Sequence, residues 1–569
     1  MKTVSYKTDL CVVGGGMAGL CTAIAAARHG IKVVLIQDRP VLGGNASSEI
    51  RMWIGGATRS GETGVPDLRE SGIIEELFLE NFYQNPALKF PLWDSVLYEK
   101  AMAEENLTLL LNSACLDAKM DGNRIVSVKA WQSNAETFHE VEATYFADCS
   151  GDSILAPLSG ANFMYGREAK SEFGESIPPD VADKKTMGMS CLFQIRETPH
   201  KVTFTPPSWA YKYESDDDLP FKEHDKENNF WWIELGGEWD AIHDTDRCRD
   251  ELLKICYGVW DHMKNYGDHD VDNWELEWIG FLPGKRESRR YVGKYIVTEN
   301  DVLSEGRFED IVAYGGWSMD DHFPAGFYHR ESYPTIFHPA PQPWGLPLRC
   351  MISENIENLV FAGRNISVTH AALSSSRVMA TCATLGQAIG TAVAQAIHDG
   401  CHVADVDVPK LQADLMEDDC YIPWHKREVS ALSKSATVSA EVVRNGFDRG
   451  EANLWRGKEG DSIVYSFDSL TPVKELRFVF DNDMNRDYHN MPCSYPLVEK
   501  SFKLPKTLMK EYRVEGIGES GEVLYTLHVA DERQRFVKHF VDWKVREIRY
   551  IPIATHGCEE FRLFSFEVK

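Results

Sequence analysis

Paired cysteines, an excess of basic residues and long apolar runs are all missing from this chain of 569 residues. Its thirteen cysteines include no C-x-x-C pair, which argues against a zinc site or a disulfide framework and favours reduced core thiols. With 60 basic against 87 acidic residues the net charge is −27. Nucleic acid and anionic membranes are therefore not expected partners, because clustered Lys and Arg dominate binding to both.

Membrane insertion is not expected either. The longest mildly apolar stretch, 368–397, contains Arg377, Gln387 and Gln395, so it is interpreted as a core helix and not as a membrane span. The chain enters an apolar strand almost at once, leaving no room for a signal peptide. These features predict a cytoplasmic protein with two or three domains.

A glycine-rich turn near the N-terminus is the strongest motif present. Gly14, Gly16 and Gly19 fit G-x-G-x-x-G, between an apolar strand expected over 9–13 and an Ala-rich helix expected over 20–29. A second apolar strand, 31–36, would complete a βαβ unit. The first glycine permits a tight turn, the second lets the backbone approach a pyrophosphate, and the third lets the helix pack closely on the sheet.

The pattern therefore predicts a dinucleotide site at a helix N-terminus, where free N–H groups attract an anion, with Met17 and Ala18 beside it. One position departs from the usual form. An acidic residue is expected at the end of the second strand, but Gln37 stands there, followed by Asp38 and Arg39. Gln37 can bond a ribose hydroxyl without charge, and Asp38 could share this role.

A pair of glycines further along the chain makes the prediction of a dinucleotide site more specific. Gly43 and Gly44 are followed by Asn45, Ala46 and Ser47. This segment resembles flavoproteins of the glutathione-reductase-like superfamily, and it is similar to FAD-dependent oxidoreductases distantly related to fumarate reductase flavoproteins. The resemblance implies that the segment runs along the ribityl chain and isoalloxazine of a non-covalent FAD.

Further blocks over residues 8–400 resemble the same family. There the strand 358–365 would meet the FAD phosphate and ribityl chain, and a helix over 375–398 would point its first turn at the flavin. The resemblance implies these additional cofactor contacts: Cys115, Gly151, Asp152, Gly363, Arg364, Asn365, Gly386, Gln387 and Ala388.

The order of the elements predicts an α/β fold. A Rossmann-like FAD-binding domain in two parts, 1–159 and 348–425, would carry an inserted α+β substrate domain, 160–347. A C-terminal β-sandwich, 431–569, resembles discoidin-like, galactose-binding-like jelly rolls, many of which bind glycans. Local patterns also predict a hairpin between strands 107–111 and 124–131, and solvated loops at the charged runs 216–218 and 222–227.

Four residues are candidates for catalysis. His370 follows the last cofactor strand, and an imidazole with a near-neutral pKa suits a general base that takes up a proton while an alcohol or amine is oxidised. A structural histidine is the alternative. Arg349 is the second choice, for an anionic or carbonyl group or reduced flavin. Arg286 and His322 come third. No metal is predicted, because the acids and histidines of 320–338 lack tight ligand spacing.

The leading hypothesis is an FAD-dependent oxidoreductase that transfers a hydride between a polar metabolite and the flavin, with sugars favoured by the jelly-roll tail. The alternatives are a fumarate-reductase-like enzyme of small carboxylates and a non-catalytic glycan-binding protein with a vestigial flavin fold. No second G-x-G-x-x-G suggests an NAD(P) site. An external electron acceptor of unknown kind is therefore expected. Whether the chain forms a homodimer is left open by the sequence.

Overall fold

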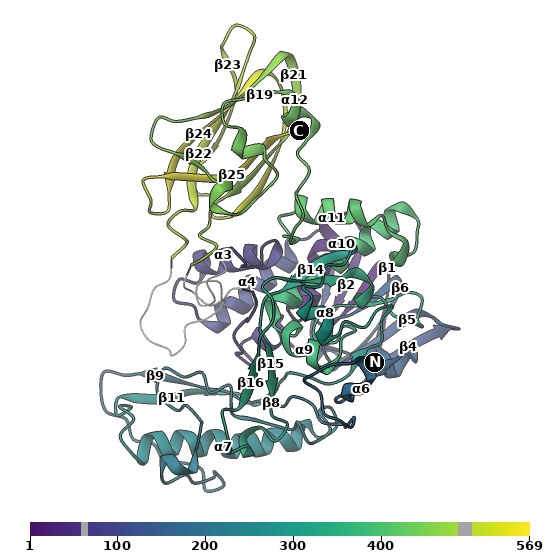
Figure 1. The fold of residues 1–569 in the computed structure, drawn as a ribbon, viewed down its shortest axis with the longest axis vertical. Coiled ribbons are helices and arrows are strands. Elements are labelled where there is room, and N and C mark those ends of the chain that lie inside the picture. Colours follow the sequence, from purple (N-terminus) through teal and green to yellow (C-terminus); the bar gives the residue numbers. More distant parts are fainter. Residues whose placement is uncertain (58–66, 487–502) are drawn as a thin grey trace. The chain divides into compact units, whose positions relative to one another are not determined.

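The computed structural model describes residues 1–57, 67–486 and 503–569. These residues form two compact units (Figure 1), the first from 1–57 and 87–411, and the second from 67–86, 412–486 and 503–569. Among the described residues, no helix combines the length and the apolar character needed to cross a membrane. Each unit is described separately.

A seven-stranded sheet forms the centre of the first unit. Its order is β3-β2-β1-β6-β5-β4, with β18 also paired to β6. The strands β1, β2, β3, β6 and β18 run parallel, whereas β5 pairs antiparallel with β6 and β4 pairs antiparallel with β5. The strand bounds are β1 Lys2–Val13, β2 Val33–Ile36, β3 Leu107–Leu110, β4 Ser113–Asp121, β5 Arg124–Gln132, β6 Thr137–Asp148 and β18 Leu359–Phe361. The predicted Rossmann-like arrangement is confirmed.

Two helices pack against each other through small residues. Helix α1, Met17–Arg28, follows the glycine-rich turn, and α10, Met379–Asp399, lies against it. A Cβ on Gly386 would come within 2.1 Å of the carbonyl oxygen of Ala18, and one on Gly390 within 2.4 Å of that of Thr22. These glycines are therefore required by close helix packing.

Two predicted elements differ in the structure. The hairpin joins β4 to β5, with Asp121 paired to Arg124, while β3 is a separate parallel strand. Between β3 and β4, Asn112 has a φ of 53°, a left-handed conformation that reverses the chain. The helix predicted over 375–398 is two helices, α9 His370–Ser376 and α10, because Val378 is extended, with ψ at 141°.

The inserted region has an aromatic core of its own. Helix α7, Thr245–Asn265, covers a pair formed by β9, Phe193–Glu197, and β11, Trp274–Ile279 (Figure 1). The core includes Phe193, Phe230, Trp232, Trp260 and Trp274. Further short elements are α5 Leu155–Ser159, β7 Phe163–Met164, α6 Lys170–Phe173, β8 Met189–Ser190, β10 Glu234–Leu235, β12 Gly284–Lys285, β13 Arg290–Tyr291, α8 Glu299–Leu303, β14 Ile311–Gly315, β15 Met319–His322, β16 Thr335–His338 and β17 Trp344–Pro347.

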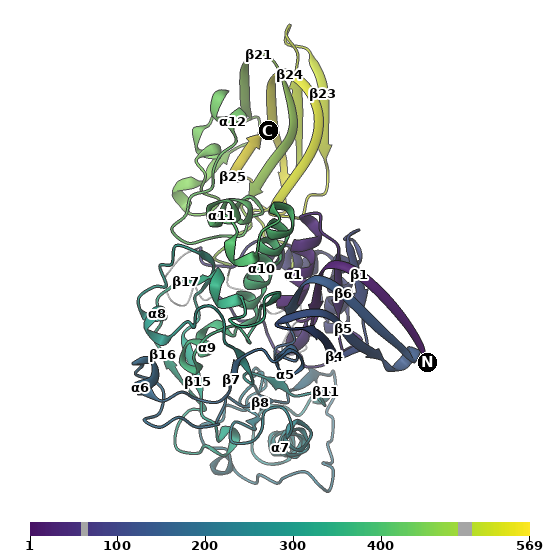
Figure 2. The ribbon, with the colours of Figure 1, turned by 90° about the vertical axis from the view of Figure 1, so that its right-hand side faces the viewer.

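The second unit contains the predicted C-terminal β domain. Its antiparallel sheet, of which Figure 2 labels β21, β23, β24 and β25, has the order β20-β25-β21-β24-β22-β23, with β19 paired to β21. The bounds are β19 Thr437–Val438, β20 Trp455–Gly457, β21 Ile463–Phe480, β22 Met509–Ile517, β23 Val523–Val529, β24 Phe536–Thr555 and β25 Phe561–Val568. Register shifts break the pairing of the long strands β21 and β24. The rings of Phe478 and Phe566 stack 4.6 Å apart in the core.

Helix α3, Ile73–Gln84, also belongs to the second unit, although it comes early in the chain. Glu75 forms a 2.6 Å ion pair with Arg486, and Glu80 pairs with Arg533 at 3.1 Å. Two further helices, α4 Phe90–Met102 in the first unit and α12 Ala431–Ser435 in the second, flank the sheets, and α11 spans Val408–Glu417.

Candidate functional site

At two positions of the motif, contacts within the protein leave room only for glycine. Gly14 has a φ of +100°, and a Cβ there would come within 2.5 Å of the backbone of Ser150. Its N–H donates to the carbonyl of Ile36 at 2.8 Å. A Cβ on Gly19 would lie 1.8 Å from the carbonyl oxygen of Gly14. The turn therefore closes only with glycine at both positions.

Gly16 is different, because no protein atom requires a glycine there. Its φ and ψ are −64° and −177°, which any residue adopts, and the nearest atom to a Cβ would be Gly44 Cα at 3.9 Å. Within the described part of the chain, no side chain caps the N-terminus of α1. An uncapped helix N-terminus with open space in front of it fits a pyrophosphate.

The second glycine pair lies directly against this turn. Gly43 and Gly44 have φ values of 99° and 57°. The N–H of Gly43 donates to the carbonyl of Gly15 at 2.9 Å, and a Cβ on Gly44 would lie 3.1 Å from Gly16 Cα. The structure thus brings together the two segments for which FAD contacts are expected.

Gln37 is committed to the motif turn. Its Oε1 accepts from the N–H of Gly15 at 2.7 Å, and its Nε2 donates to the carbonyl of Val41 at 3.1 Å. The side chain is buried, so the amide braces the turn from inside the fold. Asp38 and Arg39 form a 3.6 Å ion pair at the surface. Of these three residues, the structure gives only Gln37 a bond to the motif.

Asp152 is held by a positively charged pair. Its Oδ1 accepts from Arg364 Nη2 at 2.6 Å and from Ser288 Oγ at 2.7 Å, and its Oδ2 accepts from Lys285 Nζ at 2.8 Å. Although burial alone would raise the pKa of Asp152, Arg364 and Lys285 hold it well below its usual range. Gly151, with a φ of +76°, leaves room for the Arg364 guanidinium.

Asn365 supplies the clearest sign of a missing partner. Its Nδ2 donates to the carbonyl of Asp148 at 3.2 Å, but its buried Oδ1 has no hydrogen-bond partner within the described parts of the chain. That oxygen lies 3.4 Å from where a Cβ on Gly363 would be, beside Ala18 of α1. A buried acceptor without a donor costs about 1–3 kcal/mol, so a hydroxyl of a ribityl chain fits here.

The other expected cofactor residues fall in the same unit. Cys115 is partly buried in β4, and the Nδ2 of Asn45 donates to the carbonyl of Lys285 at 3.1 Å. The remaining members are buried on α1, on α10 or in the turn after Gly44: Met17, Ala18, Ala46, Ser47, Gln387 and Ala388. Together these residues fit FAD by chemistry and position.

His370 is the first residue of α9 and is almost fully buried, at 1% exposure. Its Nδ1 lies 2.9 Å from Glu287 Oε2, and its Nε2 lies 3.1 Å from Asp321 Oδ1. Burial alone would lower the pKa of His370, but Glu287 and Asp321 raise it to about 10. The imidazole is therefore protonated at neutral pH and has no lone pair with which to act as the expected general base.

Arg286 and His322 meet on one carboxylate. Glu234 Oε2 lies 2.7 Å from His322 Nδ1 and 3.3 Å from Arg286 Nη1. Asp320 continues the network, with His322 Nε2 at 3.2 Å and Arg377 Nη2 at 3.0 Å. Although burial alone would raise the pKa of Asp320, His322 and Arg377 hold it well below its usual range.

Strand β15 connects this network to His370. Successive side chains of a strand point to opposite faces, so Asp320 and His322 face Glu234 while Asp321 faces His370. Sequence reasoning missed Glu234 and Glu287. In the sequence Glu287 stands between Arg286 and Arg290, and this charge pattern was the available signal for an ion pair. In the structure Arg290 Nε lies 3.4 Å from Glu287 Oε1.

Arg349 lies elsewhere, which corrects its expected role. Its side chain is 45% exposed and pairs with Asp310 at 3.7 Å, and its guanidinium lies 4.8 Å from the centre of the Tyr295 ring. A guanidinium open to water binds an anion weakly. The structure therefore removes Arg349 from the candidate catalytic set.

The protonation of His370 predicts a pH dependence of stability. A folded pKa of about 10, above the ordinary value of about 6.5, stabilises the fold fully below about pH 6.5, and this stabilisation is lost as the pH rises through about 10. We expect the difference in thermal unfolding midpoint between wild type and His370→Asn to shrink over this window. A difference that does not change with pH would contradict the assignment.

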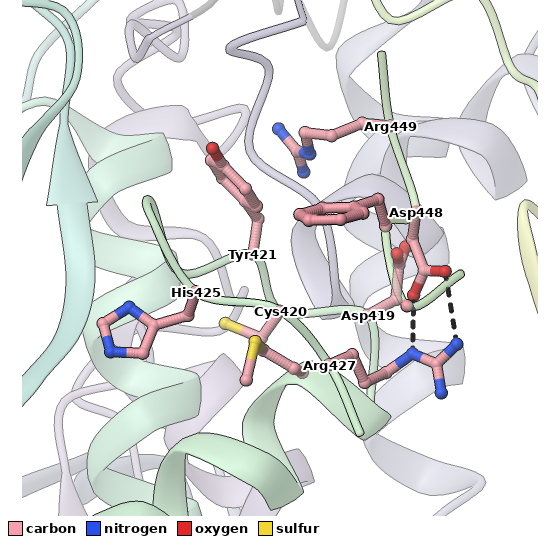
Figure 3. Close-up of a pocket in the computed structure, with 10 residues that line it drawn as sticks. Asp419, Cys420, Tyr421, His425, Arg427, Asp448 and Arg449 are labelled. Atoms are coloured by element: carbon pink, nitrogen blue, oxygen red, sulfur yellow. Dashed lines mark hydrogen bonds and ion pairs between the residues drawn. The ribbon is translucent and has the colours of Figure 1, made fainter. Parts of the chain in front are cut away.

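A small pocket of about 40 Å³ lies in the second unit (Figure 3). Arg427 Nε pairs with Asp448 Oδ2 at 2.9 Å on one side, and the Arg449 guanidinium lies 3.7 Å from the centre of the Tyr421 ring on the other. The space holds a few water molecules only. It is therefore not a site for a sugar ring.

Comparison with solved structures gives weak likenesses. A geranylgeranyl bacteriochlorophyll reductase-like protein of Thermoplasma acidophilum is 13% identical, with 73% of this chain and 85% of that chain covered and a TM-score of 0.33. For p-nitrophenol 4-monooxygenase of Pseudomonas putida the values are 12%, 74%, 91% and 0.32. A family 32 carbohydrate-binding module of Streptococcus pneumoniae is 12% identical and covers 25% of this chain, with a TM-score of 0.19 and 99% of the module covered. Scores this low carry no functional argument.

The family assignment has a stronger basis. No curated protein matches the chain. The family model described as FAD dependent oxidoreductase matches residues 9–415, a span that includes the glycine-rich turn, Asp152, Asn365 and α10. The chain therefore belongs to the FAD dependent oxidoreductase family and is an enzyme with FAD as its cofactor.

Proposed function

We propose that the enzyme oxidises a hydroxyl-bearing polar metabolite, with sugars as the favoured class, by hydride transfer to FAD. The flavin, when bound, supplies the hydride acceptor. The observation that supports the proposal is the buried pair His370 and Asp321, whose atoms Nε2 and Oδ1 lie 3.1 Å apart. His370 begins α9, just before the helix expected to face the flavin. A hydroxyl oxidation needs such a proton-exchanging group.

Asp321 and His370 have different roles in the proposed reaction. The Asp321 side chain is 18% exposed while that of His370 is 1% exposed, so Asp321 is the member that a substrate can reach. The second carboxylate oxygen of Asp321 would accept the hydroxyl proton. The imidazolium of His370, held by Glu287, would orient the first oxygen and stabilise negative charge developing on the substrate oxygen.

The pairing of the buried arginines favours an uncharged substrate. Arg286 is paired with Glu234 and Arg377 with Asp320, so neither guanidinium offers the free charge that a carboxylate substrate needs. This observation speaks against the fumarate-reductase-like alternative. The preference for sugars rests on the discoidin-like resemblance of the tail.

Replacing His370 with alanine is expected to leave FAD bound and to slow flavin reduction by the substrate at least about tenfold, because the variant loses the imidazolium that orients Asp321 and stabilises negative charge on the substrate oxygen. The measurement is anaerobic single-turnover bleaching of the flavin absorption. His200→Ala, at an exposed position, is the matched control. Unchanged single-turnover reduction in His370→Ala would remove the residue from the reaction.

Asp321→Asn separates this role from a structural one. Removing the carboxylate takes away one of the two groups that raise the pKa of His370. We expect the pH profile of flavin reduction to shift to lower pH, in addition to a slower rate. A slower rate with an unshifted profile would indicate that Asp321 only supports the fold.

The substrate class is tested with the holoenzyme. The visible spectrum is taken before and after anaerobic addition of pooled sugars, and separately of pooled small carboxylates. Bleaching by sugars supports the proposal, whereas bleaching by carboxylates alone favours the fumarate-reductase-like alternative. Subsequent reoxidation by oxygen or a quinone would identify the external acceptor.

A further inference from the structure

Three imidazoles and one carboxylate meet in the inserted region, away from the residues discussed so far. Asp216, His224, His262 and His269 each offer one ligand atom, and these atoms all lie within 4.8 Å of one another. The Nε2 atoms of His262, His224 and His269 lie 3.0, 3.3 and 3.7 Å from Asp216 Oδ1. Asp216 lies in the exposed turn that was expected for the charged run 216–218, with its side chain 74% exposed, and there it also contacts three imidazoles.

The four residues come from four different places in the chain. Asp216 begins the short 3₁₀ turn Asp216–Asp218, and His224 follows in the next loop. His262 lies in the last turn of α7, and His269 follows the end of that helix. The centroids of the three rings lie 4.9 to 5.0 Å apart, so the imidazoles form a nearly equilateral triangle around Asp216.

The backbone orients these imidazoles. His262 Nδ1 lies 3.1 Å from the carbonyl oxygen of Tyr213, and His224 Nδ1 is bonded to the carbonyl of Lys222. A carbonyl only accepts, so each Nδ1 carries the proton and donates it. An imidazole that carries its single proton on Nδ1 keeps a lone pair on Nε2, which is the arrangement that metal-binding histidines adopt.

His269 supplies an independent observation. Its Nε2 is buried and has no hydrogen-bond partner among the described residues, although it faces the other two imidazoles and Asp216. Neutral Nε2 atoms and a carboxylate oxygen are all acceptors. Four acceptors that converge without a donor repel one another, and a bound cation satisfies all of them at once.

We propose that this cluster is a zinc site with the ligand set His224, His262, His269 and Asp216. Tetrahedral Zn²⁺ with bonds of about 2.0–2.1 Å places its ligands about 3.3 Å apart, and the three Asp216 separations bracket this value. Imidazole nitrogen favours zinc over Mg²⁺ or Ca²⁺, which prefer oxygen ligands.

The metal has a structural role in this proposal. Four protein ligands complete a tetrahedral shell and leave no position for a substrate. The site joins the loop that contains Asp216 and His224 to the C-terminal turn of α7. It thereby fixes one edge of the aromatic core around Trp260 and takes no part in hydride transfer.

Metal analysis of the purified holoenzyme tests the proposal. We expect about one zinc per chain in wild type and in the control His243→Ala, which changes an exposed histidine of the same region. His262→Ala and His269→Ala are expected to hold less than a tenth as much. Their FAD content, read from the visible spectrum, is expected to equal that of wild type, which shows that the cofactor domain is folded.

A second variant guards against local misfolding. The Asp216 side chain is 74% exposed, so Asp216→Asn is tolerated by the fold and is expected to weaken zinc binding at least tenfold. Removing the metal with a chelator is expected to lower the thermal unfolding midpoint of wild type by several degrees, and adding zinc back to restore it. A wild-type protein that takes up neither zinc nor cobalt, or variants that keep the full stoichiometry, would overturn the assignment.

Discussion

Replacing Gly16 with valine is expected to give a folded protein that no longer retains FAD. The backbone at Gly16 has a conformation open to any residue, and the nearest atom to a new Cβ would be 3.9 Å away. The added methyl groups would instead fill the space in front of α1, where the pyrophosphate must approach the helix N-terminus. We expect at least a hundredfold loss of FAD affinity, measured by fluorescence titration of the apoprotein.

The comparison with a neighbouring glycine makes this test specific. Gly19→Ala places a Cβ 1.8 Å from the carbonyl oxygen of Gly14, so this variant should lose thermal stability even without FAD. Gly16→Val should match the apo wild type in thermal midpoint. If Gly16→Val binds FAD normally, the pyrophosphate does not lie against this turn.

The cofactor half could be predicted from sequence because its signals are local. The strand, the turn with Gly14, Gly16 and Gly19, the helix and the second strand follow one another within 36 residues, and the structure keeps that order. Apolar runs marked the strands well, yet β1 begins at Lys2, before the predicted start at residue 9. Residues 2–7 of this strand are exposed or only partly buried, so hydrophobicity alone gave no signal there.

Contacts between distant segments could not be predicted. The break between α9 and α10 falls at Arg377 and Val378, with no proline or glycine to mark it. The protonated state of His370 depends on Glu287 and Asp321, which are 83 and 49 residues away. A near-neutral imidazole was the natural expectation for an isolated residue, and only the folded chain supplies the two carboxylates that change it.

Removing the carboxylate of Asp448 is expected to destabilise the second unit strongly. Its Oδ2 lies 2.9 Å from Arg427 Nε and 3.2 Å from Arg477 Nη2, and its backbone carbonyl accepts from Arg535. Both paired guanidiniums are at most 3% exposed. Deleting one partner of a buried ion pair costs about 3–5 kcal/mol, because the remaining charge stays desolvated.

The measurement is the urea dependence of tryptophan fluorescence for wild type, Asp448→Ala and the control Asp468→Ala, which changes an exposed position of β21. The control should unfold with wild type. Although burial alone would raise the pKa of Asp448, Arg477 and Arg427 hold it well below its usual range, so the wild-type advantage should decline only in strong acid. An Asp448→Ala midpoint equal to that of wild type would show that the arginines find other partners.

The early position of helix α3 has a consequence for synthesis. Its residue Glu75 precedes its partner Arg486 by 411 positions. At about 5–20 residues per second, a ribosome needs roughly 20 to 80 s to add the second after the first. Helix α3 must therefore wait for this partner until residue 486 has been added. A fragment that begins at residue 412 would carry the buried Arg486 without its carboxylate. Producing the β domain as a separate module therefore requires that residues 67–86, which come early in the chain, be included with it.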